Sequence, residues 1–237
     1  MSIHQHLSTI IGHDILIDIK RTLTLKAIAI RVKGKRVTIK VPFFINNNLI
    51  EQLVNKKLSW IKKQLNIQSN FVPFEKKLYV NDEKFLYLGK YYKLRIIKNK
   101  KYSVNIEGDF LQVNVKNELN ILKIKKLLKE WFYEKSLIYF KKETHNCAKK
   151  NHLKINSVKV REYKARWGSC SNNGDISFNW RLIMAPPKII EYVIIHELMH
   201  IKEHNHSPKY WNYVKSLYPN INEAKEWLMY NGQTLNI

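Results

Sequence analysis

The stretch HELMHIKEHNH, residues 196–206, combines four histidines and two glutamates at spacings that suit a metal ion. His196 and His200 are four residues apart, so on a helix both imidazoles project from one face and can bind the same zinc ion. Glu197 follows the first histidine, as in the HExxH motif, whose glutamate acts as general base on a metal-activated water molecule. We therefore predict a Zn²⁺ site with His196 and His200 as ligands and Glu197 as the catalytic base.

A catalytic zinc site needs a third protein ligand and an open fourth position. His206 is the best candidate, because positions 196, 200 and 206 repeat the ligand spacing of the extended HExxHxxGxxH motif. His204 is the alternative third ligand. The predicted metal site therefore consists of His196, His200 and His206.

The third histidine reaches the metal only if the chain turns sharply after His200. Glu203 stands where the extended motif has glycine. We expect Asn205 to make the turn, because asparagine tolerates left-handed backbone angles. Ser207 and Pro208 are residue types that cap and begin a helix, so a second helix should start directly after the turn.

The segment that carries the motif should be a buried helix. Pro187 suits its first turn, because the missing proline N–H would have no helical partner there. A glutamate and two histidines are costly among apolar neighbours unless they are paired or bound to metal, which strengthens the metal prediction. The apolar residues expected to be buried are Ile189, Ile190, Val193, Ile194, Ile195, Leu198, Met199 and Ile201.

Three further residues are candidates for the same site. Arg166 could stabilise a developing oxyanion, or it could pair with a carboxylate such as Glu197. Tyr210 could line the substrate site, or it could pack in the core. Cys170 could bind metal or act as a nucleophile, but with three histidines at hand we expect a structural role.

The rest of the chain predicts an α+β protein, because stretches of strand periodicity alternate with stretches of helical periodicity. We expect a strand-rich N-terminal half, 1–117, and a zincin-like C-terminal catalytic domain built around the HExxH helix, 118–237. The strand after the turn at Gly174 could be an edge strand that adds an extended peptide, or part of a core hairpin. The expected elements are strands within 14–44, a helix over 48–66 with Leu49, Leu53, Leu58, Ile61 and Leu65 buried, strands within 76–116, a helix over 118–150, and strands at 156–163 and 174–182.

Composition limits the classes of protein that fit. The 237 residues include 42 basic and 19 acidic ones, a net charge of +23, which attracts polyanions such as nucleic acid or nucleotides. A compositional bias toward lysine explains the charge better, because arginine is scarce and the lysines are spread along the chain. The chain has no apolar run long enough to span a membrane and no signal peptide, and its two cysteines make no disulfide framework, so we expect a cytoplasmic protein without membrane contact.

Three segments together resemble a known family. RWGSCS, ISFNWRLIMAPP and YVIIHELMHIKEHNHSPKYW are similar to the YgjP-like metallopeptidases, relatives of the SprT-like and WLM zinc proteases. The resemblance implies a zincin-like catalytic domain with His196, His200 and His206 on zinc and Glu197 as general base. Tyr210 stands where the family has phenylalanine.

Three functions fit these features. The first is a zinc-dependent peptidase acting on a peptide or protein substrate. The second is a zinc-dependent nucleotide phosphohydrolase, although the sequence has neither a Walker-type loop nor a carboxylate cluster for two metals. The third is a nucleic-acid-binding module with a structural zinc, which would require a fourth protein ligand such as His204 or Cys170.

Overall fold

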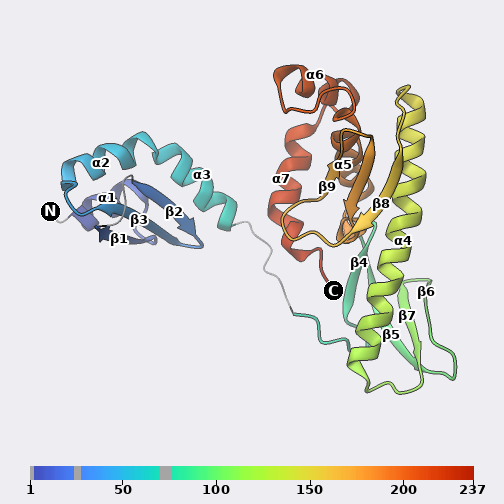
Figure 1. Ribbon diagram of the computed structural model, residues 1–237. Coiled ribbons are helices and arrows are strands. Elements are labelled where there is room, and N and C mark those ends of the chain that lie inside the picture. The colour runs from blue at the N-terminus through green and yellow to red at the C-terminus, as the bar shows by residue number, and fades with distance from the viewer. Residues whose placement is uncertain (1–2, 24–27, 70–75) are drawn as a thin grey trace. The chain divides into compact units, whose positions relative to one another are not determined.

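The computed structural model describes residues 3–23, 28–69 and 76–237, and the chain forms two compact units (Figure 1). Unit 1 spans Met1–Val72 and unit 2 spans Pro73–Ile237. Helices and several separate sheets occur together, as the α+β prediction requires. The division at 117/118, drawn on secondary-structure content and expected function, stays a prediction.

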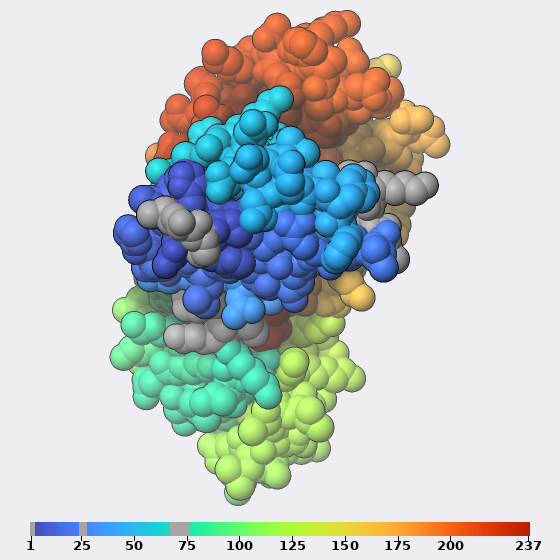
Figure 2. Space-filling view, turned by 90° about the vertical axis from the view of Figure 1, so that its left-hand side faces the viewer, coloured from blue at the N-terminus to red at the C-terminus, as the bar shows by residue number. Residues whose placement is uncertain are grey.

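Unit 1 is a three-stranded sheet with helices on one face (Figure 1). In the centre of the sheet, Val37, Ile39 and Val41 alternate along one strand and are fully buried with residues from all three helices. Figure 2 shows the light blue and cyan atoms of α2 and α3 along one side of the darker blue segment. The elements are α1 Ile3–Ile11, β1 Leu16–Thr22, β2 Ala29–Lys33, β3 Arg36–Pro42, α2 Asn47–Lys56 and α3 Leu58–Ser69, with strand order β1-β3-β2.

The single helix expected over 48–66 is wrong in two respects. The helix is divided at Lys57 into α2 and α3, and Leu49 is 40% exposed. Ile61 is fully buried, as predicted, but Ile50 and Val54 face the sheet in place of Leu49 and Leu53. Two adjacent stripes of this segment are apolar, and only packing against the sheet decides which of them is buried.

Unit 2 contains two sheets joined by a 30-residue helix, α4, which contacts strands of both (Figure 1). The first sheet, of order β4-β5-β7-β6, consists of β4 Lys84–Tyr87, β5 Lys90–Lys98, β6 Ser103–Glu107 and β7 Phe110–Val115. After α4 (Ile121–Lys150), the second sheet, of order β8-β10-β9, consists of β8 Ser157–Arg161, β9 Gly168–Cys170 and β10 Asp175–Asn179. The C-terminal elements are η1 Trp180–Met184, α5 Pro187–Met199, α6 Pro208–Leu217, α7 Ile221–Asn231 and η2 Gly232–Thr234.

The β4–β5 turn holds the start of α5 in place. Gly89 has a φ of 76° and donates its N–H to the carbonyl of Met184 at 3.1 Å. A Cβ at position 89 would lie 2.8 Å from Cα of Pro186, so only glycine fits both the backbone angle and the contact. The first sheet therefore abuts the segment from which the motif helix starts.

The strand expected at 174–182 ends earlier than predicted. Asn179 is its last residue, because the Asn179 side chain accepts the N–H of Arg181 at 3.2 Å and starts the short helix η1. The same side chain donates to the carbonyls of Tyr163 and Arg166. Asn179 thus fixes the loop before β9, which lies next to the candidate site.

Candidate metal centre

The motif lies at the end of α5, a helix that is buried on nearly every side. It contacts α4, α6, α7 and β9, and all the apolar residues predicted to be buried are buried except Ile201, which is half-buried. Pro187 is at the first helical turn, as expected. Buried neighbours therefore surround the helix that carries His196, Glu197 and His200, whereas His206, beyond its end, is exposed.

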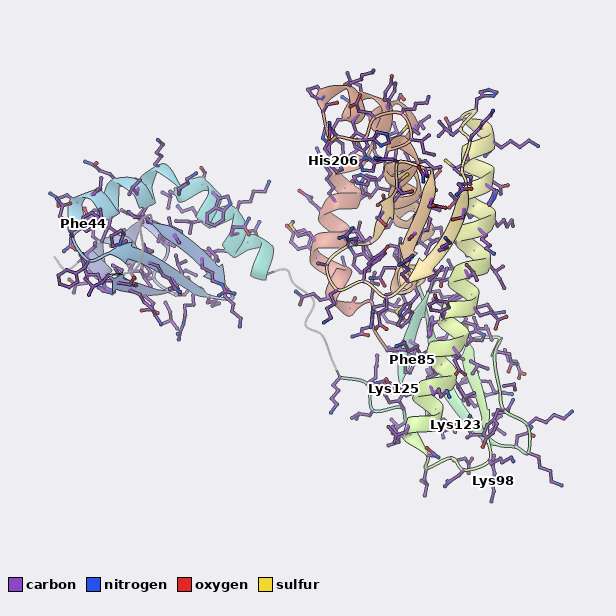
Figure 3. All side chains as sticks on the ribbon, viewed as in Figure 1. Phe44, Phe85, Lys98, Lys123, Lys125 and His206 are labelled. Carbon is purple, nitrogen blue, oxygen red and sulfur yellow. The ribbon has the colours of Figure 1, made fainter. Side chains whose placement is uncertain are left out.

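Three histidines converge where α5 ends and α6 begins (Figure 3). One potential ligand atom from each of His196, His200 and His206 lies within 4.8 Å of the other two. The Nε2 atoms of His196 and His206 are 3.2 Å apart. Two nitrogens bound to one tetrahedral zinc at ordinary bond lengths are about 3.4 Å apart, so the donor set fits a zinc ion.

The tautomer of His200 also suits a metal ligand. Its Nδ1 lies 3.3 Å from the carbonyl oxygen of Glu203. Because a carbonyl oxygen only accepts hydrogen bonds, Nδ1 carries the proton and Nε2 keeps its lone pair. Glu203, the departure from the glycine of the extended motif, thus orients His200 through its main chain.

Burial keeps the first two histidines neutral. Burial, together with charge repulsion from the nearby His200, His206 and Lys225, lowers the pKa of His196 to about 3. Burial also lowers the pKa of His200. Neutral imidazoles are the form that binds metal, so these two side chains do not need to lose a proton near neutral pH.

The turn that brings His206 back to the other two histidines has a different backbone conformation from the predicted one. Asn205 does not adopt a left-handed backbone angle. The chain instead continues α5 through tight turns, in which Lys202 and Glu203 both donate their N–H groups to the carbonyl of Met199. The prediction for Ser207 is confirmed, since its side chain accepts the N–H of Tyr210 at 3.2 Å and caps α6.

His204, the alternative third ligand, is exposed and does not belong to the histidine group. Cys170 is half-buried and also lies outside the group. Burial and the nearby Glu197 raise the pKa of the Cys170 thiol to about 11. A thiol with that pKa is protonated near neutral pH and is a poor nucleophile.

Glu197 is 5% exposed and lies beside the histidines. Burial raises its pKa to about 8, while the positive charge of Arg166 acts in the opposite direction. Its side chain packs on Gly168 of β9, where an added Cβ would stand 2.5 Å from Oε1 of Glu197. Arg166 itself is exposed, and within the described part of the chain it forms no ion pair with Glu197.

Tyr210 lies beneath the histidines and is fully buried. Its hydroxyl donates to the main-chain carbonyl of His196 at 2.8 Å, and its ring stacks on His200 with centroids 4.6 Å apart. The carbonyls of a helix's last turn have no N–H donor within the helix, and the Tyr210 hydroxyl is the donor for one of these carbonyls. Tyr210 therefore supports two histidines from inside the core, at some remove from any surface where substrate would lie.

Sequence patterns did not identify three residues that contact the site. Gly168 makes room for Glu197, as described. Trp211 stacks on His206 with centroids 5.5 Å apart, and Nζ of Lys225 lies 3.6 Å from the centroid of the Trp211 ring. The position of Trp211 on the helix after His206 predicts core packing or a substrate-lining place, not a contact with a metal ligand, and no local pattern points to Gly168 or Lys225.

Comparison with known proteins agrees with this geometry. The model of the YgjP-like family, described as a metallopeptidase domain, matches residues 26–231. The chain belongs to the YgjP-like family. Its membership makes the protein a hydrolase of the metallopeptidase class, with a metal ion as cofactor and a peptide or protein as substrate.

Two further comparisons complete the description. No curated protein matches the chain. Among solved structures, the metallopeptidase zymogen of Pyrococcus abyssi abylysin is similar over 38% of this chain and 91% of its own, with 21% identity and a TM-score of 0.36. Within the described residues, no helix is both long enough and apolar enough to cross a membrane.

Proposed function

We propose that this YgjP-like metallopeptidase is a zinc-dependent peptidase of zincin-like architecture, in which His196, His200 and His206 hold the zinc ion and Glu197 is the general base. The observation that carries the proposal is the convergence of three imidazoles next to a buried carboxylate. Two of those imidazoles are neutral near pH 7, and three ligands leave a fourth position for substrate.

A zinc ion in this site would polarise the scissile carbonyl and lower the pKa of a water molecule. Glu197 would accept the proton of the attacking water and then deliver it to the leaving amine. A carboxylate shielded from bulk water, whose proton affinity is raised by burial, is suited to both transfers near neutral pH. The backbone of Gly168 limits where the carboxylate can move, which keeps it in one orientation.

Arg166 would contribute its charge at the edge of the site. It lies close enough to Glu197 to lower the pKa of that carboxyl, and its guanidinium is exposed. An exposed cation beside a buried carboxylate can stabilise negative charge that develops on the substrate. Asn179 holds the Arg166 main chain through a 3.3 Å hydrogen bond, which would limit its movement.

An extended peptide substrate could form backbone hydrogen bonds with an edge strand beside this site. β10, the strand after Gly174, is central in its sheet, which excludes the edge-strand alternative and leaves the core hairpin. The edge on the side of α5 is β9, which contains Gly168 and contacts α5. An extended peptide that adds to β9 would place a scissile bond near Glu197.

The other two functions have less support. A structural zinc would need a fourth ligand, and neither Cys170 nor His204 is in the histidine group. No feature of the site favours nucleotide hydrolysis over peptide hydrolysis. A cytoplasmic location and nonspecific association with nucleic acid or nucleotides remain predictions of the composition.

The decisive experiment is cleavage of a mixture of unstructured peptides, followed by mass spectrometry, with zinc content measured on the same samples. We expect cleavage by the wild type and none by Glu197→Gln, with about one zinc per chain in both. Glu203→Gln is the matched control, because its side chain lies outside the histidine group. A Glu197→Gln variant that cleaves as fast as the wild type would refute the mechanism.

A further inference from the structure

The face of the unit 1 sheet that points away from its helices carries an unusual density of positive charge. Side chains alternate along each strand, so the residues that do not join the buried set with Val37, Ile39 and Val41 point outward. Within the paired stretches 16–20, 29–33 and 36–40, nine residues point outward; five of these nine are cationic, and all five are exposed. The outward residues are Leu16, Asp18 and Lys20 on β1, Arg36, Thr38 and Lys40 on β3, and Ala29, Arg31 and Lys33 on β2. The basic sheet face is defined as Lys20, Arg31, Lys33, Arg36 and Lys40.

The register places like charges directly opposite one another. Lys33 pairs with Arg36 across β2 and β3, and Lys20 pairs with Lys40 across β1 and β3. Cross-strand pairs of like charge destabilise a sheet. The arrangement therefore opposes folding unless an anion from elsewhere neutralises it.

Within its described residues, unit 1 itself supplies an anion to only one of the five cations, Lys20, which pairs with Asp18. It contains twelve basic and three acidic residues, and each of the three acidic side chains already has a partner. These ion pairs are Asp14 with Lys35 at 2.9 Å, Asp18 with Lys20 at 3.4 Å, and Glu51 with His6 at 3.8 Å. Among the described residues, none of Arg31, Lys33, Arg36 and Lys40 forms an ion pair.

We propose that the basic sheet face binds the phosphate backbone of single-stranded nucleic acid, independently of its sequence. Two of the five cations are arginines, although the whole chain has only seven, and a guanidinium matches phosphate in shape and charge. A lysine-rich composition does not account for them. The cations extend along and across the strands, which suits a ligand that carries an anion at every repeat.

Two exposed aromatic rings come directly after β3, the central strand of this sheet. Phe43 and Phe44 follow β3 beyond Lys40 and are 64% and 81% exposed (Figure 3, which labels Phe44). Unpaired bases stack on such rings, whereas the bases of a duplex are already stacked on each other. This favours a single strand. A membrane surface fits less well, because only Leu16 and Ala29 among the nine outward residues are apolar.

The test measures binding of the full chain to a fluorescent, mixed-sequence DNA strand of about 20 nucleotides by anisotropy over a salt series. The face variant carries Arg31→Gln, Lys33→Gln, Arg36→Gln and Lys40→Gln. The matched control carries Lys56→Gln, Lys57→Gln, Lys62→Gln and Lys63→Gln. It removes the same charge from the exposed lysines of α2 and α3 in the same unit.

We expect the face variant to lose roughly tenfold or more in affinity and its log–log salt slope to fall by about 3, while the control changes little. Phe44→Ala should weaken binding of the DNA but not of inorganic polyphosphate. The face variant should also melt at or above the wild-type temperature, because it lacks the like-charge pairs. If the fourfold variant fails to fold, Arg31→Gln and Arg36→Gln alone should each lower the slope by about 0.7.

Three results would overturn the proposal. Equal losses in the face variant and the control would mean that only net charge matters. Polyglutamate that competes as well as unlabelled DNA of equal charge would assign the face to acidic proteins. Binding to vesicles that contain anionic lipid, stronger than to DNA and dependent on the same residues, would assign it to a membrane surface. None of these measurements requires hydrolysis, so their outcome is independent of the peptidase mechanism.

Discussion

Gly168 lies directly against the side chain of Glu197, although the two residues belong to different elements, β9 and α5. A Cβ at position 168 would stand 2.5 Å from Oε1 and 2.6 Å from Cγ of Glu197. Glu197 is buried and cannot swing into solvent. Any larger residue at 168 must therefore displace the carboxylate or the strand.

Gly168→Ala should consequently impair catalysis without removing the metal. A displacement of about 1 Å in a catalytic group can cost about 10²-fold in rate, and we expect a loss of that order in kcat. Zinc content should remain at the wild-type value, since the histidines are not touched. Peptide cleavage and metal analysis on the same preparation provide the measurement, and unchanged kcat would show that Glu197 tolerates the shift.

His206→Ala and His204→Ala form a matched pair within one loop. Only His206 belongs to the histidine group, whereas His204 is exposed and lies outside it. We expect His206→Ala to lower zinc affinity by at least about tenfold, because two ligands remain in place of three, and His204→Ala to leave the affinity unchanged. Competition with a chelator of known affinity measures both. The reverse result would make His204 the third ligand.

Tyr210→Phe should separate the hydrogen bond of Tyr210 from its packing. The variant keeps the ring that stacks on His200 and loses the 2.8 Å hydrogen bond to the carbonyl of His196. We expect the free energy of unfolding to fall by about 1 kcal/mol, because a buried carbonyl loses its donor. Tyr210→Ala, which also removes the ring, should cost about 3 kcal/mol or more. Chemical denaturation measures both, and equal losses would show that the hydroxyl alone matters.

Burial of Glu197 predicts a pH-dependent stability of the protein after its metal has been removed with a chelator. The pKa of Glu197 is about 8 in the folded chain, against 4.5 as its ordinary value. Between these values the folded state binds one more proton than the unfolded state, so the free energy of unfolding falls as pH rises. The pKa of His196 is about 3 when folded, and this group opposes the trend only below its ordinary value of 6.5.

The clean window for this effect is therefore pH 6.5 to 8. We expect a decrease of up to about 1.4 kcal/mol per pH unit there, and a smaller one in Glu197→Gln, which has no carboxyl at this position. Urea denaturation at several pH values provides the measurement. Identical slopes in wild type and Glu197→Gln would mean that the Glu197 carboxyl is not the titrating group.

The sequence by itself identified the residues whose chemistry is local. His196 and His200 share one helix face, with Glu197 beside it, because residue order fixes the angle between side chains on a helix. Ser207 starts α6 because its side chain accepts a hydrogen bond from the backbone three residues on. Strand alternation and the turn at Gly34 likewise located the strands of unit 1, since both are properties of a few consecutive residues.

Tertiary structure decided everything that depends on contacts between distant segments. Which apolar stripe of α2 is buried, that β9 rather than β10 is an edge, and that Gly168 faces Glu197 all follow from how separate elements pack. The hydroxyl of Tyr210 reaches His196 for the same reason. Local periodicity fixes the direction in which a side chain points from its own element. Which residues of other elements it contacts is decided only when the elements pack against one another.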